Sequence, residues 1–285
     1  MIRKIMVPVR GDGKGDNVLR HAAVLAHGHK AHIEVTHCRP RPEDLMPYGV
    51  PIPDFLRKQI VEQSRQVADL EEANLRDEMK ALAAELKLEA QDRPTGDRAT
   101  VSFAEDVGRQ VDVIKRHGRL ADIIAVAKPD RDRNLGINTL KTALFHSGRP
   151  VLMCPHRETA PETLGDTIAI AWNGSAEAAR ALAQSMAVIE GAKSVYVLSN
   201  GHDAGPGTSA EDVLDYLRLH GASASIVAFE GGKSIGKALL DACAARGADL
   251  LVMGAYSDSH ELETLFGGNT QTIVDRAEMP VLFSH

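Results

Sequence analysis

Aromatic residues and cysteines are scarce in this chain. Only 4% of its 285 residues are aromatic, with a single tryptophan, so a packed core has to be built from Ala, Val, Ile and Leu. Its three cysteines, Cys38, Cys154 and Cys243, lie far apart and form no CxxC pair. This spacing excludes a disulfide framework and is typical of structural thiols in a reducing compartment, so we expect a cytoplasmic protein.

Signals for membranes, nucleic acids and known catalytic chemistry are also missing. No apolar run reaches the length of about 18 residues that a membrane span requires, and residues 1–5 lead directly into an apolar segment without a signal peptide. The net charge of −6 argues against a nucleic-acid surface or an anionic membrane as a partner. With no nucleophile elbow, catalytic triad or Walker A sequence, we expect no catalytic residues. The histidines between residues 21 and 37 lack metal-ligand spacing, so no metal site is expected.

The chain contains the same order of predicted strands and helices twice. Residues 121–126 and 151–153 are apolar segments joined by a loop and a helix, and residues 248–254 and 279–283 repeat that order in the second half. Apolar runs of this kind are typical of strands buried on both faces, and their alternation with helices requires crossover connections. A strand-loop-helix-strand unit predicts a parallel sheet with its site at the carboxyl ends of the strands.

The repeat predicts an α/β protein of two doubly wound, five-stranded parallel-sheet domains. The first covers residues 1–156 and the second residues 165–285, with a polar linker between them, and the two pack as an internal pseudo-dimer. The first half also contains a long charged helix, residues 55–86, without a counterpart in the second half. Its apolar stripe is typical of a helix that lies on its own sheet, and a surface for a partner or an oligomer is the alternative.

Three segments of the second half resemble the universal stress protein family in its tandem, two-domain form. A first strand runs into a turn with Gly174 and Ser175, a second segment reads ADLLVMG over residues 248–254, and a final strand begins at Pro280. The resemblance covers both halves almost from end to end. It implies a fold like that of the adenine nucleotide alpha hydrolases, a role in the stress response, and ATP or AMP as the ligand.

The nucleotide motif of that family is Gly, two residues, Gly, nine residues, Gly and then Ser or Thr. This chain has Gly254 and Gly267 at the first and third motif positions, but Ser257 at the second and Gly268 at the fourth. Asn173 stands where the family usually has an Asp at the adenine. The resemblance therefore implies a partly retained nucleotide loop in the second domain.

The residues of this region have physical uses that fit a nucleotide. A glycine pair leaves no side chain between the backbone N–H groups and a phosphate, and the helix that follows offers free donors and a dipole that favour an anion. An amide at the end of the first strand can hydrogen-bond a base or a ribose. The neighbouring Trp172 either covers the ligand or is a partly buried core residue. The predicted nucleotide site consists of Asn173, Gly254, Gly267, Gly268, Asn269 and Thr270. A glycine pair that only makes a tight loop and packs the last helix on the sheet is the other interpretation.

Three carboxylates in the same loop oppose a bare triphosphate. Asp258, Glu261 and Glu263 repel phosphate groups unless a divalent cation such as Mg²⁺ bridges them. The matching loop of the first half starts with Ala127 and Lys128 and has no glycine pair. We therefore expect that loop to be charged and solvated, and the first domain to bind no ATP.

These observations predict a cytoplasmic stress-response protein that binds an adenine nucleotide in its C-terminal domain and acts through ligand-dependent interaction with a protein partner. It would be a monomer, as an internal pseudo-dimer, or a homodimer. An interaction scaffold without nucleotide and a nucleotide-dependent transferase of the same architecture are the alternatives. A PP-loop sequence, Ser-Gly-Gly-x-Asp-Ser, would favour the transferase, and the chain has Asn-Gly-Ser-Ala-Glu over residues 173–177 instead. Slow ATP hydrolysis would require no committed catalytic base.

Overall fold

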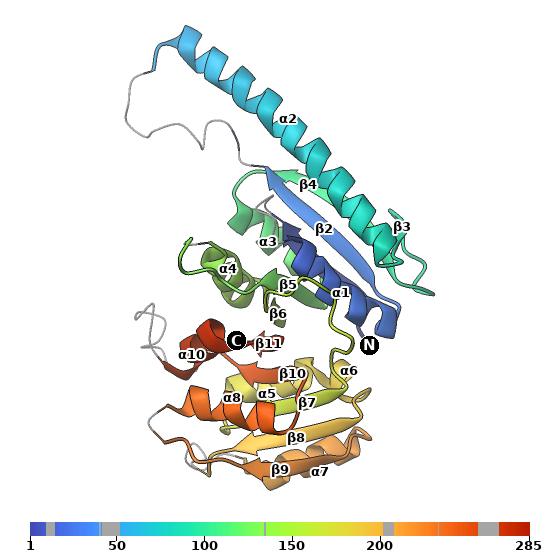
Figure 1. Cartoon of the computed structure of the whole chain (residues 1–285), viewed down its shortest axis with the longest axis vertical. Coiled ribbons are helices and arrows are strands. Elements are labelled where there is room, and N and C mark those ends of the chain that lie inside the picture. The colour runs from blue at the N-terminus through green and yellow to red at the C-terminus, as the bar shows by residue number, and fades with distance from the viewer. Residues whose placement is uncertain are drawn as a thin grey trace.

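A computed structural model gives the structure of the protein, with helices on both faces of a central sheet (Figure 1). It describes residues 1–9, 15–39, 41, 52–133, 135–201, 208–232, 234–255 and 268–285, except for the side chain of Glu71. Within those ranges no helix combines the length and the apolar character needed to cross a membrane.

The described part of the first half contains six strands, one more than the sequence predicted. In chain order its elements are β1 (Lys4–Val9), α1 (Gly15–His29), β2 (His32–Arg39), α2 (Asp54–Glu85), β3 (Glu89–Ala90), β4 (Thr100–Val107), α3 (Gln110–Gly118), β5 (Ile123–Ala127), α4 (Ile137–Ser147) and β6 (Val151–Cys154). The additional strand is the two-residue β3, which pairs with β4 at the edge of the sheet.

The second half repeats the plan with five strands. Its elements are β7 (Thr167–Ala171), α5 (Ala176–Gln184), α6 (Met186–Ile189), β8 (Ser194–Ser199), α7 (Ala210–Leu219), β9 (Ala224–Ala228), α8 (Ile235–Ala245), β10 (Leu250–Gly254), α10 (Gly268–Arg276) and β11 (Val281–Ser284). The sequence of residues 176–189 predicts one helix, but the structure divides it in two at Ser185, whose backbone N–H donates to the carbonyls of Ala181 and Leu182.

All eleven strands belong to one continuous sheet, in the order β3-β4-β2-β1-β5-β6-β11-β10-β7-β8-β9. The strands of each half stay together and pair in parallel. The halves meet where β6 and β11 pair antiparallel, with Leu152 opposite Leu282. The sequence predicted two parallel sheets and did not predict their junction. The division at residues 156 and 165 stays a prediction, although no strand of one half lies among those of the other.

Two apolar layers cover the two faces of the sheet. Alternate residues of β5 divide between them: Ile123 and Ala125 belong to the layer under α1, α2, α5, α6 and α7, whereas Ile124 and Val126 belong to the layer under α3, α4, α8 and α10. Residues 123–126 of β5 are all buried because helices cover both faces of the sheet, which explains the continuous apolar sequence of this strand.

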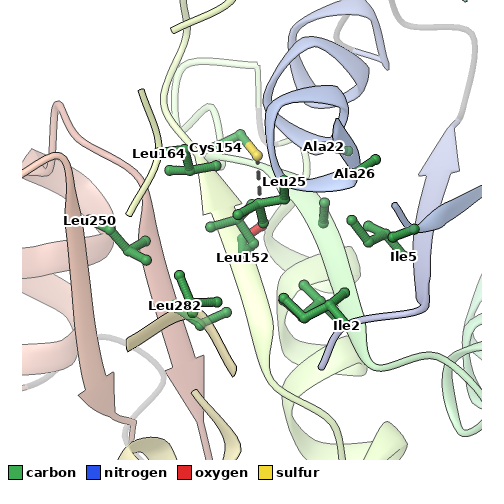
Figure 2. Packing of buried hydrophobic residues seen from close by; sticks show 14 of the residues in the cluster. Ile2, Ile5, Ala22, Leu25, Ala26, Leu152, Cys154, Leu164, Leu250 and Leu282 are labelled. Atoms are coloured by element: carbon green, nitrogen blue, oxygen red, sulfur yellow. Dashed lines mark hydrogen bonds between the residues drawn. The ribbon is translucent and has the colours of Figure 1, made fainter. Parts of the chain in front are cut away.

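The first layer is continuous across the junction of the halves. Figure 2 shows Leu152 and Leu282 between Leu25 of α1 and Leu250 of β10, with Leu164 of the linker beside them. Cys154 lies in the same layer, where its thiol donates to the carbonyl oxygen of Leu152 across 3.8 Å and burial raises the thiol pKa. The linker therefore takes part in the core that the two halves share.

Helix α2 lies on its own sheet over only part of its length. Its C-terminal half buries Leu75, Met79 and Leu82, as the sequence predicted. Its N-terminal half projects beyond the sheet (Figure 1), and Phe55 there is 73% exposed. Leu70, at the middle of the helix, is 65% exposed. The start of α3 also differs from the prediction: β4 continues to Val107 beside the end of β2, so the helix begins at Gln110 rather than at residue 107.

Candidate functional site

A cavity of about 390 Å³ opens at the carboxyl ends of the second-half strands. Strand β7 lies between β10 and β8, so the chain leaves it in one direction toward β8 and β9 and returns on its other side as β10 and β11. This reversal of strand order leaves a crevice where doubly wound proteins bind ligands. The residues that line it are Ala171, Trp172, Asn173, Ser175, Leu198, Asn200, Phe229, Ile235, Leu239, Met253, Gly254 and Asn269.

The turn between β7 and α5 places Asn173 at this cavity. Its side-chain carbonyl accepts a hydrogen bond from the backbone N–H of Ser175 at 3.2 Å, across Gly174 at a φ of 72°. Ser175 then caps α5 by accepting from the backbone N–H of Ala178 at 3.2 Å. Asn173 and Ser175 therefore form hydrogen bonds that stabilise the turn and cap α5, and the turn places Asn173 on the cavity wall.

Trp172 is both a core residue and a cavity residue. Only 6% of it is exposed, and its indole N–H donates to the carbonyl of Thr208 across 2.9 Å. Both interpretations left open by the sequence therefore apply: the ring is buried, and one side of it faces the cavity. The hydrogen bond ties the segment before α7 to the end of β7.

Gly254 is required by helix packing. A Cβ atom at this position would lie 2.6 Å from the backbone nitrogen of Ala178 and 2.6 Å from the carbonyl carbon of Glu177. The sequence suggested that this glycine lets a ligand approach; in the structure the backbone of α5 occupies that space. Gly254 also lines the cavity, so contact between Gly254 and a ligand stays a prediction.

Helix α10 begins at the cavity with Gly268 at a φ of 91°, a conformation that favours glycine. Asn269 lines the cavity and its side-chain oxygen accepts from the backbone N–H of Gly236 across 3.2 Å, joining the N-termini of α10 and α8. Thr270 is buried and is not among the residues that line the cavity, so contact between Thr270 and a ligand stays a prediction. Gly267 and the acidic residues Asp258, Glu261 and Glu263 lie outside the described residues.

The structure thus brings Asn173, Gly254 and Asn269 together, and adds residues that the sequence reasoning missed. Asn200 and Phe229 are the most informative, because each directly follows a strand, β8 and β9 respectively, that ends at the cavity. In the sequence, the position of each residue directly after a strand was the signal that could have placed it at the site. Phe229 supplies an aromatic wall, and Asn200 a third amide.

No lining residue carries a charged side chain, so the described cavity combines apolar walls with amide and hydroxyl groups. The histidines of the first half lie apart and bond to different groups: His21 to the carbonyl of Asn17, and His32 to the hydroxyls of Thr100 and Ser102. Among the described residues no three His, Cys, Asp or Glu side chains come together as metal ligands do.

The loop that follows β5 in the first half was expected to be solvated, and two of its basic residues instead contact the second half. The ammonium group of Lys128 donates to the carbonyl of Ala277 across 2.9 Å, and Arg131 pairs with Asp275 at 2.6 Å. Burial lowers the pKa of Lys128, while the charges of Asp275 and Glu278 act in the opposite direction. These contacts hold the end of α10, whose other end borders the cavity.

Two doubly wound halves joined edge to edge, with a cavity at the switch point of the second half, define a tandem, doubly wound α/β protein. The sequence profile of the universal stress protein family matches residues 1–133 and 165–285, and the chain belongs to that family.

Two solved structures match the fold over almost the whole chain. A universal stress protein from Archaeoglobus fulgidus is 16% identical, with 99% of this chain and 95% of that chain covered and a TM-score of 0.69. A protein of unknown function from Pseudomonas aeruginosa is also 16% identical, with 99% and 92% covered and a TM-score of 0.54. A universal stress protein in complex with cAMP matches 54% of this chain at 14% identity, with 97% of that chain covered and a TM-score of 0.30. No curated protein matches the chain in sequence.

Proposed function

We propose that the second domain, residues 165–285, binds an adenine nucleotide, ATP or AMP, and that occupancy changes the interactions of the protein with a partner in a cytoplasmic stress response. The observation that carries the proposal is the cavity at the switch point of the second half. Its volume lies within the range of small-molecule sites, and its position is the one at which doubly wound sheets bind nucleotides.

The chemistry of the cavity suits a purine base. A base has flat apolar faces and an edge of donors and acceptors, and proteins hold such groups between aromatic or apolar side chains and amides. Trp172, Phe229 and Met253 supply aromatic and apolar surface for the faces of the base. Asn173 and Asn200 supply amide groups for its edge. The N-terminus of α10 lies at the rim, where its backbone donors favour the phosphate of a nucleotide.

The proposed activity is binding rather than catalysis. A ligand that binds one conformation better than another shifts the population toward it, and binding also stabilises the folded state by mass action. Helix α10 offers a structural connection, because it begins at the cavity and ends at the contacts with Lys128 and Arg131 of the first half. No residue is proposed as a general base.

Calorimetric titration of the full chain with adenosine, AMP and ATP tests the proposal, with Asn173→Asp as the informative variant. Asp keeps the acceptor that Ser175 needs and adds a negative acceptor for the amino group of adenine, so adenosine affinity should rise about threefold to tenfold. Asn138→Asp, at the start of α4, adds the same charge in the first half and should leave the affinity unchanged. Equal effects of both substitutions, or no binding at millimolar adenosine, AMP and ATP, would contradict the proposal.

The scaffold function is the second candidate, and the projecting half of α2 favours it. Phe55 and Leu56 are exposed next to each other at the start of α2, and Leu70 is exposed at the middle of the helix. Adjacent exposed apolar side chains are typical of interaction surfaces. Sedimentation of the full chain and of a Phe55→Ser, Leu70→Ser variant tests this candidate. A smaller particle for the variant supports a surface that joins copies of the chain, and identical particles argue against it.

A further inference from the structure

The first half contains a cavity of its own, of about 410 Å³, beside the start of α3. The described residues that line it all belong to the first half, so it is separate from the cavity at the second-half switch point. Three of them, Arg41, Arg109 and Arg116, are positively charged, and Asp112 is the one carboxylate. The described lining therefore carries an excess of positive charge, whereas the described lining of the second-half cavity has no charged side chain.

Helix α3 brings two of the three arginines to one wall of this cavity. The wall consists of Arg109, Asp112, Val113 and Arg116, which lie at helical spacing. Arg109 is the N-cap residue and makes no side-chain cap, so the first backbone N–H groups of the helix remain for another acceptor. The positive end of the helix dipole and two guanidinium groups thus border the same space.

The turn between β4 and α3 forms another part of the lining. The backbone N–H of Gly108 donates to the carbonyl of Arg39 across 2.9 Å, and its carbonyl accepts from the thiol of Cys38 at 3.2 Å. Gly108 has a φ of 148°, which favours glycine, and the space where a Cβ atom would lie is open. The turn is therefore tied to the end of β2, while Val107 and Val113 add apolar surface to the cavity.

Each guanidinium keeps hydrogen-bond donors for a ligand. The Nε of Arg109 donates to Asp112 across 3.1 Å, and the Nη2 of Arg116 pairs with Asp106. Among the described residues neither guanidinium has a further partner, and Arg41 has no ion pair. A guanidinium has five N–H donors, so one engaged nitrogen leaves most of them free. The two carboxylates therefore orient Arg109 and Arg116 without using up their donors.

This arrangement of donors suits a phosphate group. A phosphomonoester has three terminal oxygens and a charge of about −1.5 to −2 at neutral pH, and arginine matches its geometry with paired hydrogen bonds. We propose that the first-half cavity binds a small phosphomonoester. The phosphate contacts Arg109, Arg116 and the start of α3, and the organic part lies against Val107 and Val113. This site is independent of the nucleotide site proposed in the second half.

Calorimetric titration of the full chain at low ionic strength tests the proposal, with phenyl phosphate and inorganic phosphate as ligands. Phenyl phosphate should bind ~3-fold or more tightly than inorganic phosphate, because the valines contact its apolar part. Equal affinity of the two would overturn the phosphomonoester as the ligand class. No binding of either at millimolar concentration would overturn the site altogether.

Arg109→Gln should weaken phenyl phosphate ~10-fold or more, because it removes charge-assisted hydrogen bonds to the phosphate. Arg218→Gln is the matched control. Arg218 forms an equally exposed ion pair with Asp215, three residues away on α7 in the second half, as Arg109 does with Asp112. The control should change the affinity less than ~2-fold, and equal losses in the two variants would overturn the proposal.

Asp112→Asn provides a gain of binding that loss of structure does not imitate. Since Asp112 is the one carboxylate in the described lining, removing its charge should tighten phenyl phosphate ~3-fold or more. Asp215→Asn makes the same change in the control pair and should leave the affinity as it is. Phosphate bound elsewhere, such as at the start of α10, would leave the affinity of Arg109→Gln and Asp112→Asn unchanged, and that result would overturn the proposal.

Discussion

Lys128 and Ala277 join the two halves of the protein: the ammonium group of Lys128 donates to the carbonyl oxygen of Ala277, the residue directly after α10, across 2.9 Å. Lys128 directly follows β5 in the first half, at the sequence position that corresponds to the start of the glycine-motif loop after β10 in the second half. A cation at a helix C-terminus is stabilising, and Arg131 adds an ion pair with Asp275, two residues before Ala277. The first half thus supports the helix on which the second-half site is built.

Removing this contact should weaken the whole molecule. Lys128→Met keeps the aliphatic length but leaves the Ala277 carbonyl without its charged donor, so we expect the free energy of unfolding to fall by about 1.5–3 kcal/mol. Urea denaturation measures the change. Lys58→Met, in the exposed half of α2, is the control and should alter stability by less than about 0.5 kcal/mol. Equal stability of the two variants would show that the interlobe hydrogen bond contributes nothing.

Gly254 provides a test of helix packing against β10. Gly254→Ala places a Cβ within 2.6 Å of the α5 backbone, which cannot move as a flexible side chain can, so the free energy of unfolding should fall by about 1–3 kcal/mol or more. Gly28→Ala is the matched control, because the space around Gly28 in α1 is open and alanine is the better helix former. Thermal unfolding should show a lower Tm for the first variant and an unchanged or higher Tm for the second. A tolerated Gly254→Ala would contradict the close approach.

Glu34 should contribute stability that depends on pH. Burial raises the pKa of this carboxyl, but hydrogen bonds from Lys4 and His117 outweigh it, so the pKa lies below its ordinary value of 4.5. A depressed carboxyl pKa means that the contribution is complete above about 4.5 and is lost as the pH falls through the lower, folded-state value.

Glu34→Gln should therefore lower stability by about 1–3 kcal/mol at pH 7 and make the loss between pH 5 and 3 less steep. Urea midpoints measured across that range provide the comparison. Glu62→Gln, on the exposed part of α2, is the control and should reproduce the profile of the unchanged protein. A Glu34→Gln profile parallel to that of the unchanged protein would exclude this linkage.

Cleavage in the linker at about residue 161 tests the domain division. We expect residues 1–156 and 165–285 to fold separately, because the strands of each half pair among themselves. Each piece should be less stable than the whole, since separation exposes Leu152 and Leu282 and the edges of β6 and β11. Gel filtration and circular dichroism of each piece decide the matter, and a lack of cooperative unfolding in either piece would mean that one unit spans the chain.

Much of the fold was determined by local sequence. The apolar runs of β5, β6, β10 and β11 and the helices between them were predictable because strands buried on both faces and helices buried on one face leave different periodicities. The end of β7 at the site was predictable for a related reason: Asn173 and Gly174 form a turn whose residue types are local. Membership of the family followed from the same segments.

Other features depend on residues that are distant in the chain, and only the tertiary structure decided them. The antiparallel pairing of Leu152 with Leu282 makes one sheet of two, because each strand lies at the edge of its half and an edge pairs with whichever strand it meets. The contact of Lys128 with Ala277 and the fit of Gly254 against α5 likewise depend on elements brought together by folding. The sequence could show a charged loop and a glycine, but which group each one faces is a property of three-dimensional packing.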